Sequence, residues 1–153
     1  MKNKTYHYTE CGLNNIHLIN GFKINKLQDG NEEIFIQDIN GLHRAIGNSL
    51  IFKAGLLSGD EIKFIRTTLD FSQKTLASLL GLDYQSILAY EKNKTSISKT
   101  ADHFLRVIFY SHLNKDPEIY NKIKEIADLD AELVKNTRQE QMEFYEGEWR
   151  IAA

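Results

Sequence analysis

Four side chains near the start of the chain could bind a metal or attack a substrate: His7, Cys11, His17 and His43. The spacing His7-x-x-x-Cys11 would allow an imidazole and a thiolate to share one zinc ion, with His17 or His43 completing the ligands. The alternative is that Cys11 is a small buried hydrophobe and the histidines form ordinary hydrogen bonds. Thiolates usually supply at least two ligands of a structural zinc site, and this chain has a single cysteine. We therefore predict no metal and no cofactor.

Catalysis through Cys11 and a nearby histidine would make the protein an enzyme. Such a nucleophile pair needs an oxyanion or phosphate loop rich in glycine, and no such loop accompanies it. We therefore predict a non-enzyme without catalytic residues. A Cys11/His enzyme remains the alternative from a different functional class.

Basic side chains farther along the chain suit phosphate chemistry instead. They are Lys63, Arg66, Lys74, Lys92, Lys94 and Lys99. As a solvated surface these side chains would need no partner, but their concentration in one region favours contact with phosphates.

The net charge of −2 hides an uneven distribution. Residues 1–56 carry six Lys/Arg against five Asp/Glu, and residues 57–113 carry seven against six. Residues 114–153 carry six against ten, so the acidity lies in the C-terminal part. A nearly neutral domain can still bind nucleic acid if its cations gather on one face.

The elements that must position these side chains indicate an α+β protein. Residues 1–56 predict a small α+β domain: strands at 22–27 and 33–37 flank the hairpin signal Asp29-Gly30, and another short strand includes His17-Leu18. The helix that follows has an apolar face of Leu42, Ala45, Ile46, Ser49 and Leu50, and we expect it to pack on the sheet and end at Gly55.

Residues 57–113 predict an all-α domain of five helices. Ser58 and Glu61 form a capping box, and Ser72, Asp83 and Ser98 each precede a further helix. The first of these helices has a buried stripe of Ile62, Ile65 and Leu69.

Residues 114–153 predict an acidic helical tail with a short terminal strand. Pro117 suits the first helical position, and an apolar stripe runs from Ile119 to Leu133. This stripe either packs against the preceding domain or forms a seam with another chain. The final strand-like segment contains Phe144, Tyr145 and Trp149.

The segment from Leu69 to Lys94 carries the functional signal. Two short helices joined by a turn of three or four residues at Gly81 meet at a steep angle, and the small Ala77 permits close approach. Ile87 and Tyr90 would hold the second helix in the core. Its outer residues would then form a rigid platform of the size that enters a DNA major groove.

The same segment resembles the Xre family of phage repressor and Cro-like regulators. The matching residues are Ser72-Gln73, Leu76-Ala77, Leu80-Gly81, Ile87, Tyr90-Glu91 and Lys92-Asn93-Lys94. The resemblance implies a lambda-repressor-like helix-turn-helix domain whose recognition helix spans residues 83–92. The DNA-binding residues that we predict are Ser72, Gln73, Lys74, Tyr84, Gln85, Ser86, Leu88, Ala89, Lys92 and Lys94.

A wider resemblance includes the front of the chain. Residues 6–12 and 41–46, placed ahead of an Xre-like domain, are similar to MqsA-type antitoxins. Those proteins hold zinc with paired Cys-x-x-Cys motifs, and this chain has only Cys11. The resemblance implies a toxin-binding first domain and an operator-binding second domain.

These observations predict a sequence-specific transcriptional repressor. We expect a homodimer on a palindromic operator of double-stranded DNA, acting as the antitoxin of a type II toxin–antitoxin system that represses its own operon, with a small basic toxin as partner. The alternative is a phage or mobile-element repressor without a toxin. We expect a soluble cytoplasmic protein, because no stretch could span a bilayer, no secretory signal is present, and a lone cysteine suits a reducing compartment.

Overall fold

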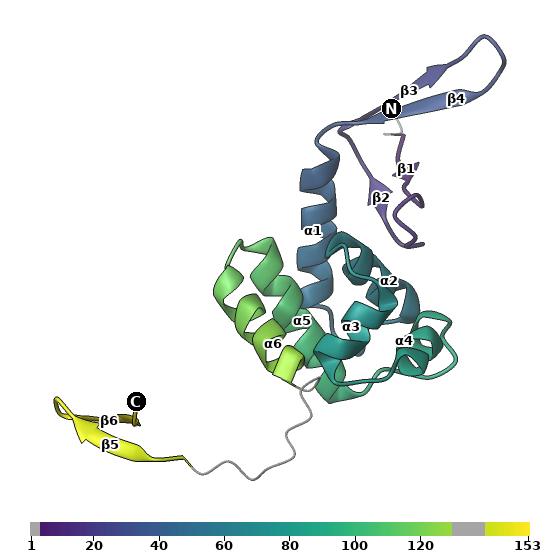
Figure 1. Cartoon of the computed structure of the whole chain (residues 1–153). Coiled ribbons are helices and arrows are strands. Elements are labelled where there is room, and N and C mark those ends of the chain that lie inside the picture. The colour runs from purple at the N-terminus through teal and green to yellow at the C-terminus, as the bar shows by residue number, and fades with distance from the viewer. Residues whose placement is uncertain (1–3, 130–139) are drawn as a thin grey trace.

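The chain is a mixed α+β protein, as its sequence predicts. The computed structural model describes residues 4–129 and 140–153, and within them lie six helices and three antiparallel two-stranded sheets (Figure 1). None of the helices in these described parts is both long and apolar enough to cross a membrane.

Four consecutive helices form the body: α2 (Gly59–Thr68), α3 (Gln73–Leu80), α4 (Tyr84–Glu91) and α5 (Lys99–Leu113). All four predicted N-caps are confirmed, since the side chains of Ser58, Ser72, Asp83 and Ser98 each accept a backbone N–H from the first turn. The predicted capping box of Ser58 and Glu61 is also present. These caps satisfy backbone donors that the helix itself leaves unpaired.

The core lies where the helices of the body meet. The predicted stripe of Ile62, Ile65 and Leu69 is buried. The other side chains in the centre of this core come from α3, α4 and α5: Leu76, Ile87, Leu105, Ile108 and Phe109. Close packing of these apolar groups is the main stabilising term for the body.

The prediction of five helices within residues 57–113 is wrong, because that range has four. A fifth helix, α6 (Pro117–Leu129), comes from the expected tail and packs against α5 and α3. The ring of Tyr120 stacks on Phe71 at a centroid distance of 5.8 Å. The tail therefore begins as part of the body.

The apolar stripe of α6 divides between two environments. Ile123 packs against the core, whereas Ile119, Ile126 and Leu129 are exposed. Leu133, the last residue of the predicted stripe, lies outside the described residues.

The front of the chain contains two small hairpins. Strands β3 (Phe22–Lys26) and β4 (Glu32–Ile36) pair around Asp29-Gly30, which confirms the predicted turn. The predicted strand at His17-Leu18 is β2 (His17–Leu18), and it pairs with β1 (Tyr6–His7), a strand that the sequence did not indicate.

Helix α1 (Ile39–Ile51) differs from the prediction in its end and in its buried face. It ends at Ile51 rather than near Gly55. Of the predicted face, Ile46 and Leu50 are buried and Leu42 packs against the core, whereas Ala45 and Ser49 are exposed. Its buried face instead lies against α5 (Figure 1). Gly47 permits this approach, since a Cβ atom there would lie 2.8 Å from Cζ of Phe109. Whether residues 1–56 fold as a separate domain stays a prediction.

The C-terminal segment is a hairpin rather than the single strand that was expected. Strands β5 (Met142–Tyr145) and β6 (Glu148–Ile151) are joined by Glu146 and Gly147, whose φ angles are 51° and 83°. Positive φ at both turn residues matches the twist of the two strands.

Candidate nucleic-acid interface

A sharp turn between α3 and α4 determines how α4 is presented. Gly81 adopts the left-handed conformation with φ of 65°, which ends α3 without the strain that a side chain would cause. The N–H of Leu82 donates to the carbonyl of Ala77 at 2.9 Å, and Asp83 then caps α4. Ala77 is buried at this contact, as its small size predicts. The turn therefore fixes α4 beside α3.

One face of α4 is held in the core and the other faces outward. Ile87 is completely buried and Tyr90 is half-buried, which confirms the predicted inner face. Tyr84 and Gln85 are exposed at the start of the helix. The remaining predicted contact residues on α4 are half-buried: Ser86, Leu88 and Ala89. A rigid helix with exposed side chains near its N-terminus is thus available to a partner.

A buried ionic network locks the far end of α4. Glu91 is only 5% exposed and pairs with Arg66 from α2, which is 13% exposed. Both carboxylate oxygens take part, since Arg66 Nη2 donates to Oε2 at 3.2 Å while Arg66 Nε donates to Oε1. Gln73, the first residue of α3, donates its amide nitrogen to the same Oε2 at 2.7 Å. Three helices are therefore joined at Glu91 by charge-assisted hydrogen bonds.

This network was not recognised in the sequence. Arg66 was counted among the phosphate-binding cations, but its charge is matched by Glu91 and it also donates to the carbonyl of Phe71. Gln73, one of the predicted DNA-binding residues, uses one of its two amide hydrogens on Glu91. The second hydrogen remains for an anion, because a primary amide has two donors. The one indication of this network in the sequence is the acidic Glu91, which directly precedes the basic residues Lys92 and Lys94.

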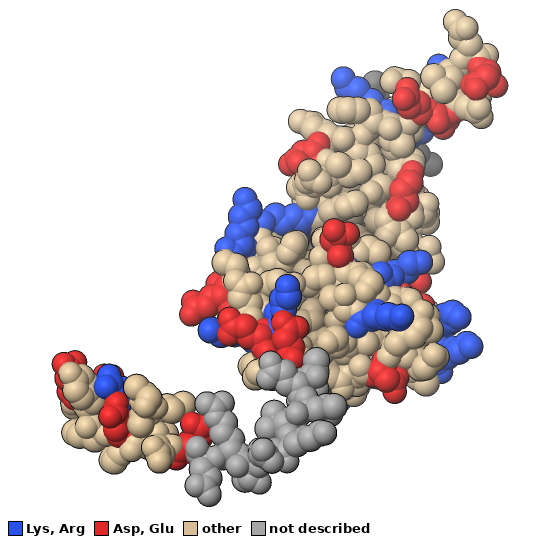
Figure 2. Space-filling model, in the orientation of Figure 1, with Lys and Arg blue, Asp and Glu red and all other residues tan. Residues whose placement is uncertain are grey.

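The lysines around α4 remain at the surface. Lys74 lies with Nζ 5.8 Å from the ring centre of Tyr84, which places a cation beside an exposed aromatic side chain. Lys92 and Lys94 are exposed directly after α4. Between them Asn93 accepts the N–H of Gly59 at 2.9 Å and so fastens this loop to α2. Figure 2 shows Lys and Arg gathered where the body carries α4.

Two predicted contact residues use their hydroxyls within the helix caps. Ser72 accepts the N–H of Thr75 at 3.0 Å, and the hydroxyl of Ser86 donates to Asp83 at 3.1 Å. Any role of these serines at a phosphate would add to their capping role.

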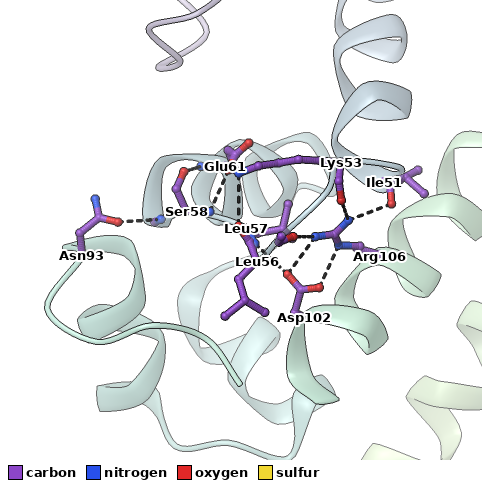
Figure 3. A network of polar contacts seen from close by, with 11 residues as sticks. Ile51, Lys53, Leu56, Leu57, Ser58, Glu61, Asn93, Asp102 and Arg106 are labelled. Atoms are coloured by element: carbon purple, nitrogen blue, oxygen red, sulfur yellow. Dashed lines mark hydrogen bonds and ion pairs between the residues drawn. The ribbon is translucent and has the colours of Figure 1, made fainter. Parts of the chain in front are cut away.

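A second ionic network holds the α1–α2 loop (Figure 3). Asp102 pairs with Arg106 at 2.9 Å and accepts the N–H of Leu57 at 2.8 Å. Arg106 also donates to the carbonyls of Ile51 and Lys53 at 3.1 and 2.6 Å. This network fixes the loop on α5, so its charges are not available to a ligand.

Glu61 adds a further ion pair to this second network. It pairs with Lys53 and accepts the N–H of Ser58 at 2.8 Å. Burial by itself raises the pKa of Glu61, but the hydrogen bonds from Lys53 and Ser58 outweigh burial and hold that pKa below its ordinary value.

The candidate metal ligands at the front of the chain are engaged with other groups. The rings of His7 and His17 stack at 4.5 Å, and His43 Nε2 shares a hydrogen bond with the hydroxyl of buried Tyr8 at 2.7 Å. Cys11 is half-buried near the carbonyl of Tyr8. Across residues 4–129 and 140–153, no three His, Cys, Asp or Glu side chains form a group that could hold a metal ion.

Comparison with protein-family models, with curated proteins and with solved structures gave no match to this chain. The geometry of α3, α4 and their supporting network is therefore the basis for assigning a function.

Proposed function

We propose that the protein is a sequence-specific DNA-binding repressor in which α3 and α4 form a helix-turn-helix and α4 is the recognition helix. The observation that carries this proposal is the arrangement of α4. Its inner side is fixed by Ile87 and by the Glu91 network, while Tyr84 and Gln85 are exposed at its N-terminal end. A recognition helix contacts bases through residues near its N-terminus. Five consecutive helices, α2 to α6, agree in number with the predicted five-helix domain and so support the proposal, with the fifth lying beyond residue 113.

The side chains of α4 suit contact with base edges. Gln85 can form two hydrogen bonds with adenine, and the apolar Leu88 and Ala89 can pack on a thymine methyl group. Lys92 and Lys94, which follow the helix, are free to contact the phosphate backbone.

The DNA is expected to be a palindrome bound by a homodimer, because a two-fold protein matches two half-sites. The lysines that would contact phosphates are Lys74, Lys92 and Lys94. If each neutralises one phosphate in each subunit, log K should fall with log salt at a slope of about −5.

The test begins with selection of duplexes from a randomised library and measurement of their affinity by fluorescence anisotropy. Gln85→Ala should weaken specific binding by about 1–3 kcal/mol, with little effect on random duplex. Gln28→Ala is the matched control, because Gln28 is an exposed glutamine in the β3–β4 turn. If Gln85→Ala and Tyr84→Ala both leave the affinity unchanged, α4 is not the recognition helix.

We further propose that the repressor acts as an antitoxin whose front region binds a small basic toxin. Exposed apolar side chains on and beside the front hairpins, Ile19 and Phe35, support this part of the proposal. Such groups on a sheet edge suit a partner strand or groove. The test is co-expression with the adjacent reading frame, using Phe35→Asp and, as control, the exposed Trp149→Asp. If the product of the adjacent reading frame does not co-purify with the wild-type protein, a phage-type repressor without a toxin is favoured.

A further inference from the structure

The outer face of α5 carries an unpartnered apolar stripe. Val107 and Tyr110 are each 47% exposed, and Phe104 is half-buried one turn before Val107. At the C-terminal end of α5, Phe52 is 75% exposed and its ring meets that of Tyr110 at 6.4 Å. At the other end, a groove lined by Phe104 and Val107 also contains residues from the end of α3 and the following turn, Leu80 and Leu82. These six residues are called the α5 stripe: Phe52, Leu80, Leu82, Phe104, Val107 and Tyr110.

The α5 stripe lacks unpaired charge. The two charged residues nearest its centre, Asp102 and Arg106, pair with each other and with the α1–α2 loop. Arg106 donates to the carbonyls of Ile51 and Lys53 (Figure 3) and so holds the backbone on either side of Phe52, whose ring contacts that of Tyr110. The groove at the other end is rimmed by uncharged or weakly basic side chains, namely Ser98, Thr100 and His103. A contiguous exposed apolar surface of this kind marks a protein interface.

We propose that the α5 stripe is the homodimer interface, in which α5 packs antiparallel on α5 of a second copy. The two-fold axis passes near Val107, which lies at the middle of α5. Phe104 and Tyr110 are three residues to either side, so the axis brings Phe104 of one copy onto Tyr110 of the other. An interface of this type must be complementary to itself.

The ends of the α5 stripe meet the same requirement. The axis that pairs Phe104 with Tyr110 also directs the Leu80–Leu82 end of one copy toward Phe52 of the other. Within the α5 stripe, apolar side chains of one copy therefore face apolar side chains of the other.

A second copy suits the α5 stripe better than it suits the exposed side of α6. There the apolar Ile126 and Leu129 alternate with charged neighbours, including the exposed pair of Lys122 and Glu125. A two-fold contact through such a surface would bring ionised groups together and require their desolvation. The uncharged α5 stripe avoids that cost.

The interface rests on the proposed function and makes it more specific. Leu82 belongs to the α5 stripe and directly precedes Asp83, the cap of α4. Dimerisation through the stripe would therefore fix the separation of the two α4 helices, which determines the spacing of the two half-sites.

The experiment is sedimentation equilibrium of the full chain over a range of concentrations. Val107→Lys places two like charges opposite each other at the axis and should weaken dimerisation by at least ~10-fold. The matched controls are Ile126→Lys on α6 and Trp149→Lys on β6, both at more exposed positions. These two variants should remain dimeric. Circular dichroism melts establish that each variant is folded.

A charge-swap experiment tests the position of the axis. Because residue 107 faces residue 107 of the second copy, an equimolar mixture of Val107→Lys and Val107→Glu chains should form heterodimers more tightly than either variant alone forms homodimers. A wild-type monomer at all concentrations would overturn the proposal, as would a folded dimeric Val107→Lys protein or a mixture that fails to associate.

The DNA measurements separate failure of the interface from failure of the proposed function. Gln85→Ala should stay dimeric while its specific DNA binding weakens. A dimer that depends on Val107 but selects no DNA would leave the interface standing and contradict the repressor. Specific DNA binding by a protein whose dimerisation does not depend on Val107 would support the repressor and contradict the interface.

Discussion

The helical body and the two longer hairpins differ in how their apolar side chains are used. In the body, Ile65, Ile87 and Leu105 are completely buried between helices. In β5–β6, the cross-strand neighbours Phe144 and Trp149 are 61% and 69% exposed, and Phe35 on β4 is similarly open. The strands β5 and β6 therefore pair without burying these two rings, whereas β3–β4 is intermediate, because Phe22 and Ile36 pack against the core. Since an isolated two-stranded hairpin is only marginally stable, the body together with α1 and the buried Tyr8 and Leu13, which share its core, should account for nearly all of the folding free energy.

The strongest test of this contrast removes a charge from inside the body. Glu91→Ala leaves Arg66 buried without a counter-ion, so the free energy of unfolding should fall by about 3–5 kcal/mol. The matched control is Glu125→Ala, since Glu125 pairs with Lys122 at 3.1 Å while both side chains are about two-thirds exposed. Loss of this exposed ion pair should lower the free energy of unfolding by less than about 1 kcal/mol. Urea denaturation measures both effects, and equal losses would show that burial does not distinguish the two pairs.

The next test concerns the contact of α1 with the body. Replacing a helical glycine with alanine ordinarily stabilises a helix by about 0.5–1 kcal/mol. At Gly47 the new methyl group would lie 2.8 Å from Phe109 and 3.0 Å from Leu113. We therefore expect Gly47→Ala to destabilise the protein by about 1–3 kcal/mol through overpacking. A thermal melt gives the sign directly, and an increase in melting temperature would mean that α1 does not pack closely on α5.

The sequence predicted well those elements that are specified by neighbouring residues. Ser58, Ser72, Asp83 and Ser98 were recognised as caps because a cap and its helix are adjacent in the chain. The buried face of α2 followed from apolar spacing, and the β3–β4 turn followed from Asp29-Gly30. In each case the residues that give the signal are close in sequence to the element that they specify.

Features that depend on distant partners could not be predicted in this way. Glu91 meets Arg66 across 25 residues, and Asp102 meets Leu57 across 45, so spacing gives no indication of either contact. The apolar spacing of α1 correctly indicated Ile46 and Leu50 as buried, but it could not show that α5 rather than the hairpin covers this face at Gly47. The exposed residues of the candidate interface remain predictions, since their role depends on a partner.

A smaller effect is expected from Glu61, which supports the start of the body. Its pKa in the folded protein lies below the ordinary value, so its contribution is present above the pKa of the unfolded chain and is lost as pH falls through the folded value. Glu61→Gln should therefore reduce stability by about 1 kcal/mol near pH 7. The difference from wild type should shrink as pH falls below the ordinary glutamate pKa of about 4.3 and disappear below the folded pKa of Glu61. Exposed Glu33→Gln in β4 is the control, and a difference that persists at low pH would contradict an ionic role for Glu61.

The smallest effect should come from removing the C-terminal hairpin. A chain ending at Leu129 keeps α6 and its stacking of Tyr120 on Phe71, but lacks β5 and β6. Its stability should match that of the full chain within about 0.5 kcal/mol, because exposed side chains contribute little. Trp149 is the only tryptophan of the protein and lies on β6, so its fluorescence reports on the hairpin alone. In the full chain, we expect the fluorescence change to precede the helical transition measured by circular dichroism, because the hairpin by itself is only marginally stable. Two-state unfolding of the whole chain would instead require the two transitions to coincide. Coincident transitions together with a less stable truncated chain would instead make the hairpin part of the body.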